Sequence, residues 1–135
     1  MQLSYTIPNA EVNILSGLKK HTIRSDKKDR WKAGRIIHHA VNPYSKLRRV
    51  FHVDKCISIQ KICISYTGRQ EPSGLVIHIS GRRLKADKIK ALIINDGFQS
   101  ISEFINWFFP VDKKSGKRLP IQWKGKIIHW TNLKY

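Results

Sequence analysis

Apolar and polar residues alternate along much of the chain, which is the period of half-buried β-strands. In the segment 56–66, CISIQKICISY, the apolar residues change parity at Gln60–Lys61. We expect a β-bulge there, because an extra residue in one strand moves the following side chains to the opposite face. The alternation as a whole predicts strands over residues 2–7, 20–24, 35–41, 56–66, 75–80 and 124–133.

Three segments have the spacing of helices instead. Residues 8–17 predict a short helix closed by a glycine, and residues 86–96 and 100–109 predict two further helices. Ser100 and Glu103 match the S-x-x-E capping box at the start of the last one. The residues of the two late helices that we expect in the core are Ile89, Leu92, Ile93, Phe104, Ile105 and Phe108.

The order of these elements predicts the fold class. Strands, a short early helix, more strands, two consecutive helices and a closing strand are typical of an α+β protein. A chain of 135 residues is long enough for one domain with a core of its own. We therefore expect a single α+β domain over residues 1–135, in which helices flank a small, strongly bent sheet or β-barrel.

The charge of the chain narrows the choice of partner. There are 26 Lys and Arg residues against 9 Asp and Glu residues, which gives a net charge of +17 spread over the whole length. A body with this charge repels itself, and nucleic acid is the commonest partner that relieves the repulsion. The alternatives are a generally basic protein and a module whose basic surface meets an acidic protein. A membrane surface is disfavoured because no basic amphipathic helix stands out.

The common catalytic and metal-binding motifs are absent from the sequence. It contains no GxxxxGK[ST], no GxGxxG and no HExxH. The adjacent His38 and His39 point to opposite faces of a predicted strand, so they cannot share one metal ion. His78 and His129 lie in apolar strands and are interpreted as half-buried residues at the edge of the core. No metal or cofactor is expected.

The cysteines and the first residues of the chain indicate the compartment. Cys56 and Cys63 belong to one predicted strand, whose rise separates their Cα atoms by about 23 Å, too far for a disulfide. We expect both to be small buried residues in a reducing environment. MQLSYTIPNAEVN lacks the features of a signal peptide, and no apolar run approaches membrane-spanning length. A cytoplasmic location is therefore expected.

Residues 14–36, ILSGLKKHTIRSDKKDRWKAGRI, concentrate eight basic residues in one stretch. On an extended chain Thr22 and Arg24 share a face, and Lys19 joins them only if the turn after Gly17 brings it round. The stretch is either a binding site or a solvated, charged loop. The candidate nucleic-acid-binding residues are Lys19, Lys20, Arg24, Lys27, Lys28, Arg30, Trp31 and Lys32.

Aromatic residues next to basic ones are candidates for stacking on bases. Trp31 lies in a polar loop, where it either stacks on a base or packs back onto the sheet. Trp123 is the second candidate. Trp107 and Trp130 are expected in the core, because apolar residues surround them in the sequence.

Three motifs, in this order along the chain, resemble the ASCH family of small PUA-like domains. They are ILSGLKKHTIR followed by WKAGRI, then NDGFQSISEFINWF, and finally GKIIHWTNLKY. The resemblance spans nearly the whole chain and implies a bent β-barrel with a cleft lined by the I-L-x-G-x-K segment. Members of the family are regarded as binding RNA or other nucleic acid. Some resemble a 4-acetylcytidine amidohydrolase, and others have been viewed as ribonucleases.

The resemblance also implies roles for particular residues. The amidohydrolases use a Lys, a Thr and a Glu, which correspond here to Lys19, Thr22 and Asp96, and Arg24 matches the arginine that follows. Thr22 would attack an acyl carbon, Lys19 would take the proton, and Asp96 would orient Lys19 or protonate the leaving group. Aspartate is one methylene shorter than glutamate, which reduces its reach.

Asp96 also has a structural interpretation. The NDG sequence around it is a strong turn or helix-ending signal on its own. RNA binding is therefore the leading hypothesis, with a small amidohydrolase or a ribonuclease as the alternative.

Overall fold

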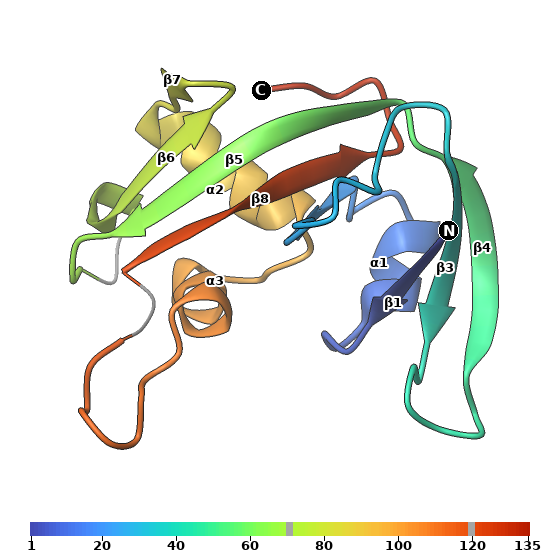
Figure 1. Ribbon diagram of the computed structural model, residues 1–135, viewed down its shortest axis with the longest axis horizontal. Helices are drawn as coiled ribbons and strands as arrows, with labels where there is room; N and C mark the ends of the chain where they lie inside the picture. Colours follow the sequence, from blue (N-terminus) through green and yellow to red (C-terminus); the bar gives the residue numbers. More distant parts are fainter. Residues whose placement is uncertain (70–71, 119–120) are drawn as a thin grey trace.

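The structure, a computed structural model, describes residues 1–69, 72–118 and 121–135 as two β-sheets with three α-helices (Figure 1). The small sheet has the strand order β1-β3-β4, and the large sheet has the order β2-β8-β5-β6-β7. The strands are β1 (Gln2–Tyr5), β2 (His21–Arg24), β3 (Ile36–Val41), β4 (Arg49–Lys55), β5 (Ser58–Tyr66), β6 (Leu75–Ile79), β7 (Arg82–Arg83) and β8 (Gln122–His129). The helices are α1 (Ala10–Leu15), α2 (Ala86–Asn95) and α3 (Ile101–Phe108), with a 3-10 turn at Pro72–Gly74.

The predicted α+β class is confirmed, and the predicted barrel is not. Strand β1 runs parallel to β3, and the other strand pairs are antiparallel. Within the described ranges, no ladder of hydrogen bonds joins the small sheet to the large one. The small sheet and α1 instead cover one face of the large sheet at one end, and α2 and α3 cover the opposite face (Figure 1).

The large sheet therefore contributes to two hydrophobic cores, one on each face. In β8, Ile127 belongs to the core beneath α2 and α3, and its neighbour Ile128 belongs to the core beneath the small sheet. Strand β5 does the same, because Ile62 and Ile64 pack in the first core and Ile59 packs against the second. Burial on both faces explains the change of apolar parity along this strand.

The predicted bulge at Gln60–Lys61 is consequently wrong. The pairing of β5 with β8 runs without a shift from Ser58 opposite His129 to Ser65 opposite Gln122. The irregularity lies instead in β3, between His39 and Ala40. A change of parity shows only which face of the strand carries the apolar residues. In a strand that lies between two cores, this face can change along the strand without an extra residue.

Strand β4 is absent from the sequence prediction. It forms the edge of the small sheet, and most of its residues are exposed on both faces, so it lacks the alternation that reveals a half-buried strand. Its charged ends, Arg49 and Lys55, are typical of strands that resist pairing with other molecules at an open sheet edge.

The predicted helices are confirmed with small changes at their ends. The six core residues expected in α2 and α3 are all buried. The Ser100 hydroxyl accepts a hydrogen bond from the Glu103 amide (3.1 Å), and the Glu103 carboxylate accepts one from the amide of Gln99 (3.1 Å). The first helix is followed by Gly17, whose φ of 81° suits a glycine at a helix C-terminus.

Histidines and cysteines largely follow their expected placement. His38 is exposed and His39 is buried, as opposite faces require. His129, however, is fully buried rather than half-buried, and its Nε2 lies 2.9 Å from the side-chain oxygen of Gln60. Both cysteines are free thiols; Cys56 is buried and Cys63 half-buried. Over the described ranges, the helices are all too short or too polar to cross a membrane.

Candidate functional site beside strand β2

The candidate site begins where α2 ends. Asp96 follows the last residue of this helix, and the chain then turns at Gly97, whose φ is 94°. The segment after α1 crosses this helix end, so that the Lys20 amide donates to the carbonyl of Asn95 (2.8 Å). The Lys19 ammonium donates to the carbonyl of Asp96 (2.5 Å). A cation is stabilised at this position because helix dipoles leave partial negative charge at a C-terminus.

Lys19 is buried, although it is a lysine in a charged stretch. Its side chain is 3% exposed, its Nζ also donates to the carbonyl of His21 (2.9 Å), and the Asp96 carboxylate lies 3.6 Å away. Burial lowers the pKa of Lys19 from its ordinary 10.5 to about 8, and the Asp96 charge opposes that shift. The carbonyl bonds show that Lys19 has a structural role at the end of α2, whatever else it does.

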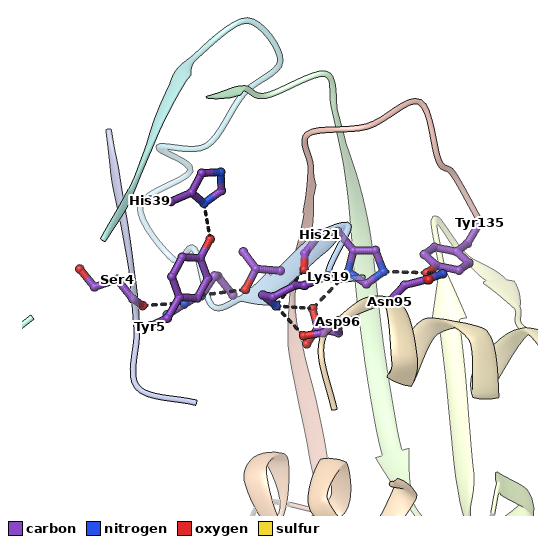
Figure 2. A network of polar contacts seen from close by, with 10 residues as sticks. Ser4, Tyr5, Lys19, His21, His39, Asn95, Asp96 and Tyr135 are labelled. Atoms are coloured by element: carbon purple, nitrogen blue, oxygen red, sulfur yellow. Dashed lines mark hydrogen bonds and ion pairs between the residues drawn. The ribbon is translucent and has the colours of Figure 1, made fainter. Parts of the chain in front are cut away.

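His21 is a central residue that the sequence analysis did not single out. It is fully buried, with Nδ1 3.1 Å from the Asp96 carboxylate and Nε2 2.6 Å from the Tyr135 hydroxyl (Figure 2). The Asn95 amide donates to the same hydroxyl (3.0 Å). Because a carboxylate only accepts, Nδ1 carries the proton and Nε2 accepts from Tyr135. Burial lowers the pKa of His21, which keeps the ring neutral.

A pocket of about 60 Å³ opens beside β2, next to this network. Lys19, Thr22, Arg24 and Asp96 all line it, so the four residues that the resemblance singled out lie together in space. They come from separate parts of the chain, since Asp96 follows α2 and the others lie at or before β2. Trp107 also lines the pocket and is 50% exposed, so its expected place in the core is wrong.

The hydrogen bonds within the pocket differ from those of a catalytic pair. Thr22 is buried, and its hydroxyl accepts from Nε of Arg24 (3.3 Å). Among the described residues no hydrogen bond joins Lys19 to Thr22, because the Lys19 ammonium faces the Asp96 and His21 carbonyls. Asp96 is placed to orient Lys19, whereas proton transfer from Thr22 to Lys19 needs a hydrogen bond between them that the described residues do not form.

Tyr5 forms a wall of the pocket and is fixed by a second network. Its hydroxyl lies 2.7 Å from Nδ1 of His39, whose Nε2 lies 2.9 Å from the Asp54 carboxylate. The Arg24 guanidinium stands over the Tyr5 ring, 5.3 Å from its centre, and donates to the carbonyl of Ser4 (2.7 Å). Burial lowers the pKa of His39 to about 4 and raises that of Tyr5, so both stay neutral near pH 7.

Most of the predicted residues that do not line the pocket lie in the loop after β2. Lys27, Lys28 and Arg30 are exposed there, as is Lys32, and Lys20 is exposed before β2. Carboxylates order the loop. Asp26 accepts hydrogen bonds from the amides of Arg30 (3.0 Å) and Trp31 (2.9 Å), and the Lys126 ammonium donates to it (3.0 Å).

Trp31 is 6% exposed and packs in the core beneath the small sheet. Its ring offers almost no face to a base, which corrects its assignment as a nucleic-acid-binding residue. Trp123 is half-buried and packs edge-on against Phe108, with ring centres 4.8 Å apart, and Trp130 packs against the core beneath the small sheet. The exposed tryptophan next to the candidate site is therefore Trp107.

A methyl group at Gly97 is expected to disturb Lys19. A Cβ there would lie 3.1 Å from Cδ of Lys19, and the positive φ would add strain. Gly34 has nearly the same φ, 91°, with open space around its missing Cβ, so it is the matched control. We expect Gly34→Ala to lower the free energy of unfolding by about 1–2 kcal/mol. Gly97→Ala should cost about 1 kcal/mol more, measured by urea denaturation. Equal losses would show that the contact with Lys19 is not tight.

The comparisons with known proteins add no assignment to this geometry. No protein-family model, no curated protein and no solved structure matches the chain. Within residues 1–69, 72–118 and 121–135, no group of three or more His, Cys, Asp and Glu side chains is arranged to hold a metal ion.

Proposed function

We propose that this chain is a PUA-like protein of the ASCH type that binds single-stranded RNA, with one nucleotide at the pocket beside β2. The observation that carries the proposal is the meeting of the three motif segments around one site. Lys19 belongs to the first motif, Asp96 to the second and Tyr135 to the third, and His21 bridges Asp96 to Tyr135. Residues this far apart in the sequence come together only through the fold, so their convergence supports the resemblance.

The side chains at the pocket suit a nucleotide. The exposed indole of Trp107 offers a face on which a base can stack. The Arg24 guanidinium has one nitrogen, Nη1, without a hydrogen bond to the described residues, and it can donate to a phosphate or to a base edge. A pocket of about 60 Å³ is too small for a whole nucleotide, so we expect the base to lie across its mouth.

An amidohydrolase acting on an acylated nucleoside such as 4-acetylcytidine is the alternative. The lowered pKa of Lys19 favours it, because a lysine with a pKa of about 8 is neutral, and so free to take a proton, in a far larger fraction of molecules near pH 7 than an ordinary lysine. The Thr22 hydroxyl would attack the acetyl carbon, its proton would pass to Lys19, and cytidine would leave with that proton before water releases acetate. Release of cytidine by the wild-type protein would replace the binding proposal by this one.

Trp107 gives the first test of the binding proposal. Stacking of a base on an aromatic ring contributes about 1–3 kcal/mol, so Trp107→Ala should weaken binding of a short single-stranded RNA about fivefold or more. Tyr44 is the matched control, because it is 96% exposed and does not line the pocket. Tyr44→Ala should leave the affinity within twofold.

Fluorescence anisotropy with labelled RNA measures both affinities, and thermal unfolding confirms that both variants are folded. Equal affinities for wild type, Trp107→Ala and Tyr44→Ala would remove the pocket from the proposal. If the wild-type protein binds no RNA at low salt but binds an acidic polypeptide, the acidic-protein alternative takes its place.

A further inference from the structure

A second candidate surface lies on the half of the large sheet that the small sheet leaves uncovered (Figure 1). In β5, Ile62 and Ile64 face α2 and α3, so Lys61 and Cys63 face the opposite side. Lys124 and Lys126 of β8 pair with these two residues across the strands and share their face. A groove of about 470 Å³ runs over this face, and it is separate from the pocket of Lys19.

The groove is lined by an unusual number of lysines. Lys61 and Lys126 stand directly opposite each other on neighbouring strands, an arrangement that destabilises a sheet through repulsion. The Asp26 and Asp29 carboxylates pair with Lys126. Lys27, Lys61 and Lys124 also line the groove, and none of them has a carboxylate partner among the described residues. Folding alone gives no reason to collect these charges on one face.

We propose that this groove binds the phosphate backbone of the single-stranded RNA whose nucleotide occupies the pocket. Lys61 and Lys124, which have no carboxylate partner among the described residues, are diagonal neighbours on the two strands and lie about 7–8 Å apart, on the order of the spacing between successive phosphates of an extended strand. Lysine ammonium groups recognise phosphates without reading the base, so this surface would hold RNA of any sequence.

The groove and the pocket are lined by residues that follow one another in the sequence. Arg24, the last residue of β2, lines the pocket, and the next residues, Ser25 to Lys27, line the groove. One RNA strand can therefore contact both surfaces. The inference rests on the proposed function for the identity of its ligand, but it concerns different side chains and predicts a different dependence on RNA length.

The test compares two double variants that lose the same charge. Lys61→Ala/Lys124→Ala removes unpaired lysines of the groove, and Lys88→Ala/Lys90→Ala removes exposed lysines of α2, which covers the other face. Affinity is measured at several salt concentrations for RNA of about 20 nucleotides, a length that exceeds a single small site. A trinucleotide, which reaches only the pocket, is measured in parallel.

We expect Lys61→Ala/Lys124→Ala to weaken binding of the long RNA about fivefold and to leave the trinucleotide unchanged. The plot of log affinity against log salt should become less steep by about 1.4, because each phosphate contact on a single strand contributes about 0.7 to the magnitude of its slope. The α2 double variant should change the affinity for the long RNA less than twofold.

Equal losses in the two double variants would overturn the groove proposal, because general charge would then explain the binding. An unchanged affinity of Lys61→Ala/Lys124→Ala for the long RNA would overturn it as well, and so would an equal loss for the trinucleotide. Binding of polyglutamate that depends on Lys61 and Lys124, without RNA binding, would assign the groove to an acidic protein instead. Failure of the pocket proposal gives a different result: the RNA affinity of Trp107→Ala would equal that of the wild type.

Discussion

Replacing Lys19 with methionine is expected to weaken RNA binding at least tenfold at pH 7. The buried Lys19 ammonium balances the buried Asp96 carboxylate, 3.6 Å away, at the pocket of the candidate site. Without the lysine, an uncompensated negative charge remains where an anionic ligand has to approach, and buried charges without partners cost several kcal/mol. Lys28→Met removes an exposed charge of the same sign outside the pocket and the groove, which is worth a few tenths of a kcal/mol.

A double variant separates two explanations for such a loss. Lys19→Met/Asp96→Asn has no charge on either residue. If Lys19 acts by balancing Asp96, this variant should recover most of the lost affinity; if Lys19 contacts the ligand, it should recover little. Titrations of the purified variants, with melting curves as a folding control, decide between them. A similar loss for Lys19→Met and Lys28→Met would show that residues 14–36 act only as a charged surface.

Strong local signals were sufficient to predict much of the fold. The two late helices were predictable because their apolar residues recur at helical spacing, and all six expected core residues are buried. The strands that pack on one or both faces were predictable as well, because their apolar residues alternate or follow one another. Strand β4 was not, because an exposed edge strand buries too little of either face to impose a pattern.

The site was predictable only for the residues that the resemblance to the ASCH family pointed to. Lys19, Thr22 and Asp96 were expected together, and they line one pocket. The burial of Lys19 had no signal in the sequence, since the residue lies in a basic stretch and its partners come from the end of α2. His21 had no signal either, because its contacts lie 75 and 114 residues further along the chain.

The tryptophans show how far local reasoning can mislead. Trp31 lies among charged residues, yet the loop folds back through Asp26 and Lys126 and places the ring in a core. Trp107 lies among apolar residues, yet Phe104 and Phe108 occupy the buried side of α3 and leave the indole at the helix surface. In both cases the exposure of the ring depends on which face of the element meets the rest of the protein, which neighbouring residues do not determine.

Lys19 should also make the stability of the protein depend on pH in a defined direction. Its pKa is about 8 in the folded protein and about 10.5 when it is exposed by unfolding. Below pH 8 the lysine is charged in both states, so the full cost of burying its charge is present. Between pH 8 and 10.5 the unfolded chain binds more protons than the folded one, and stability therefore rises with pH.

The expected gain is about 3 kcal/mol, because each unit of pKa shift corresponds to about 1.4 kcal/mol. Other lysines and tyrosines titrate over the same range, so the quantity to measure is the free energy of unfolding of wild type minus that of Lys19→Met. We expect this difference to rise by about 3 kcal/mol in favour of wild type between pH 7 and 10.5 in urea titrations. Lys28→Met, which removes an exposed lysine, is the matched control for the loss of one titrating group. A difference that stays constant within about 1 kcal/mol would mean that Lys19 keeps its proton, and its role as a proton acceptor for Thr22 would fall with it.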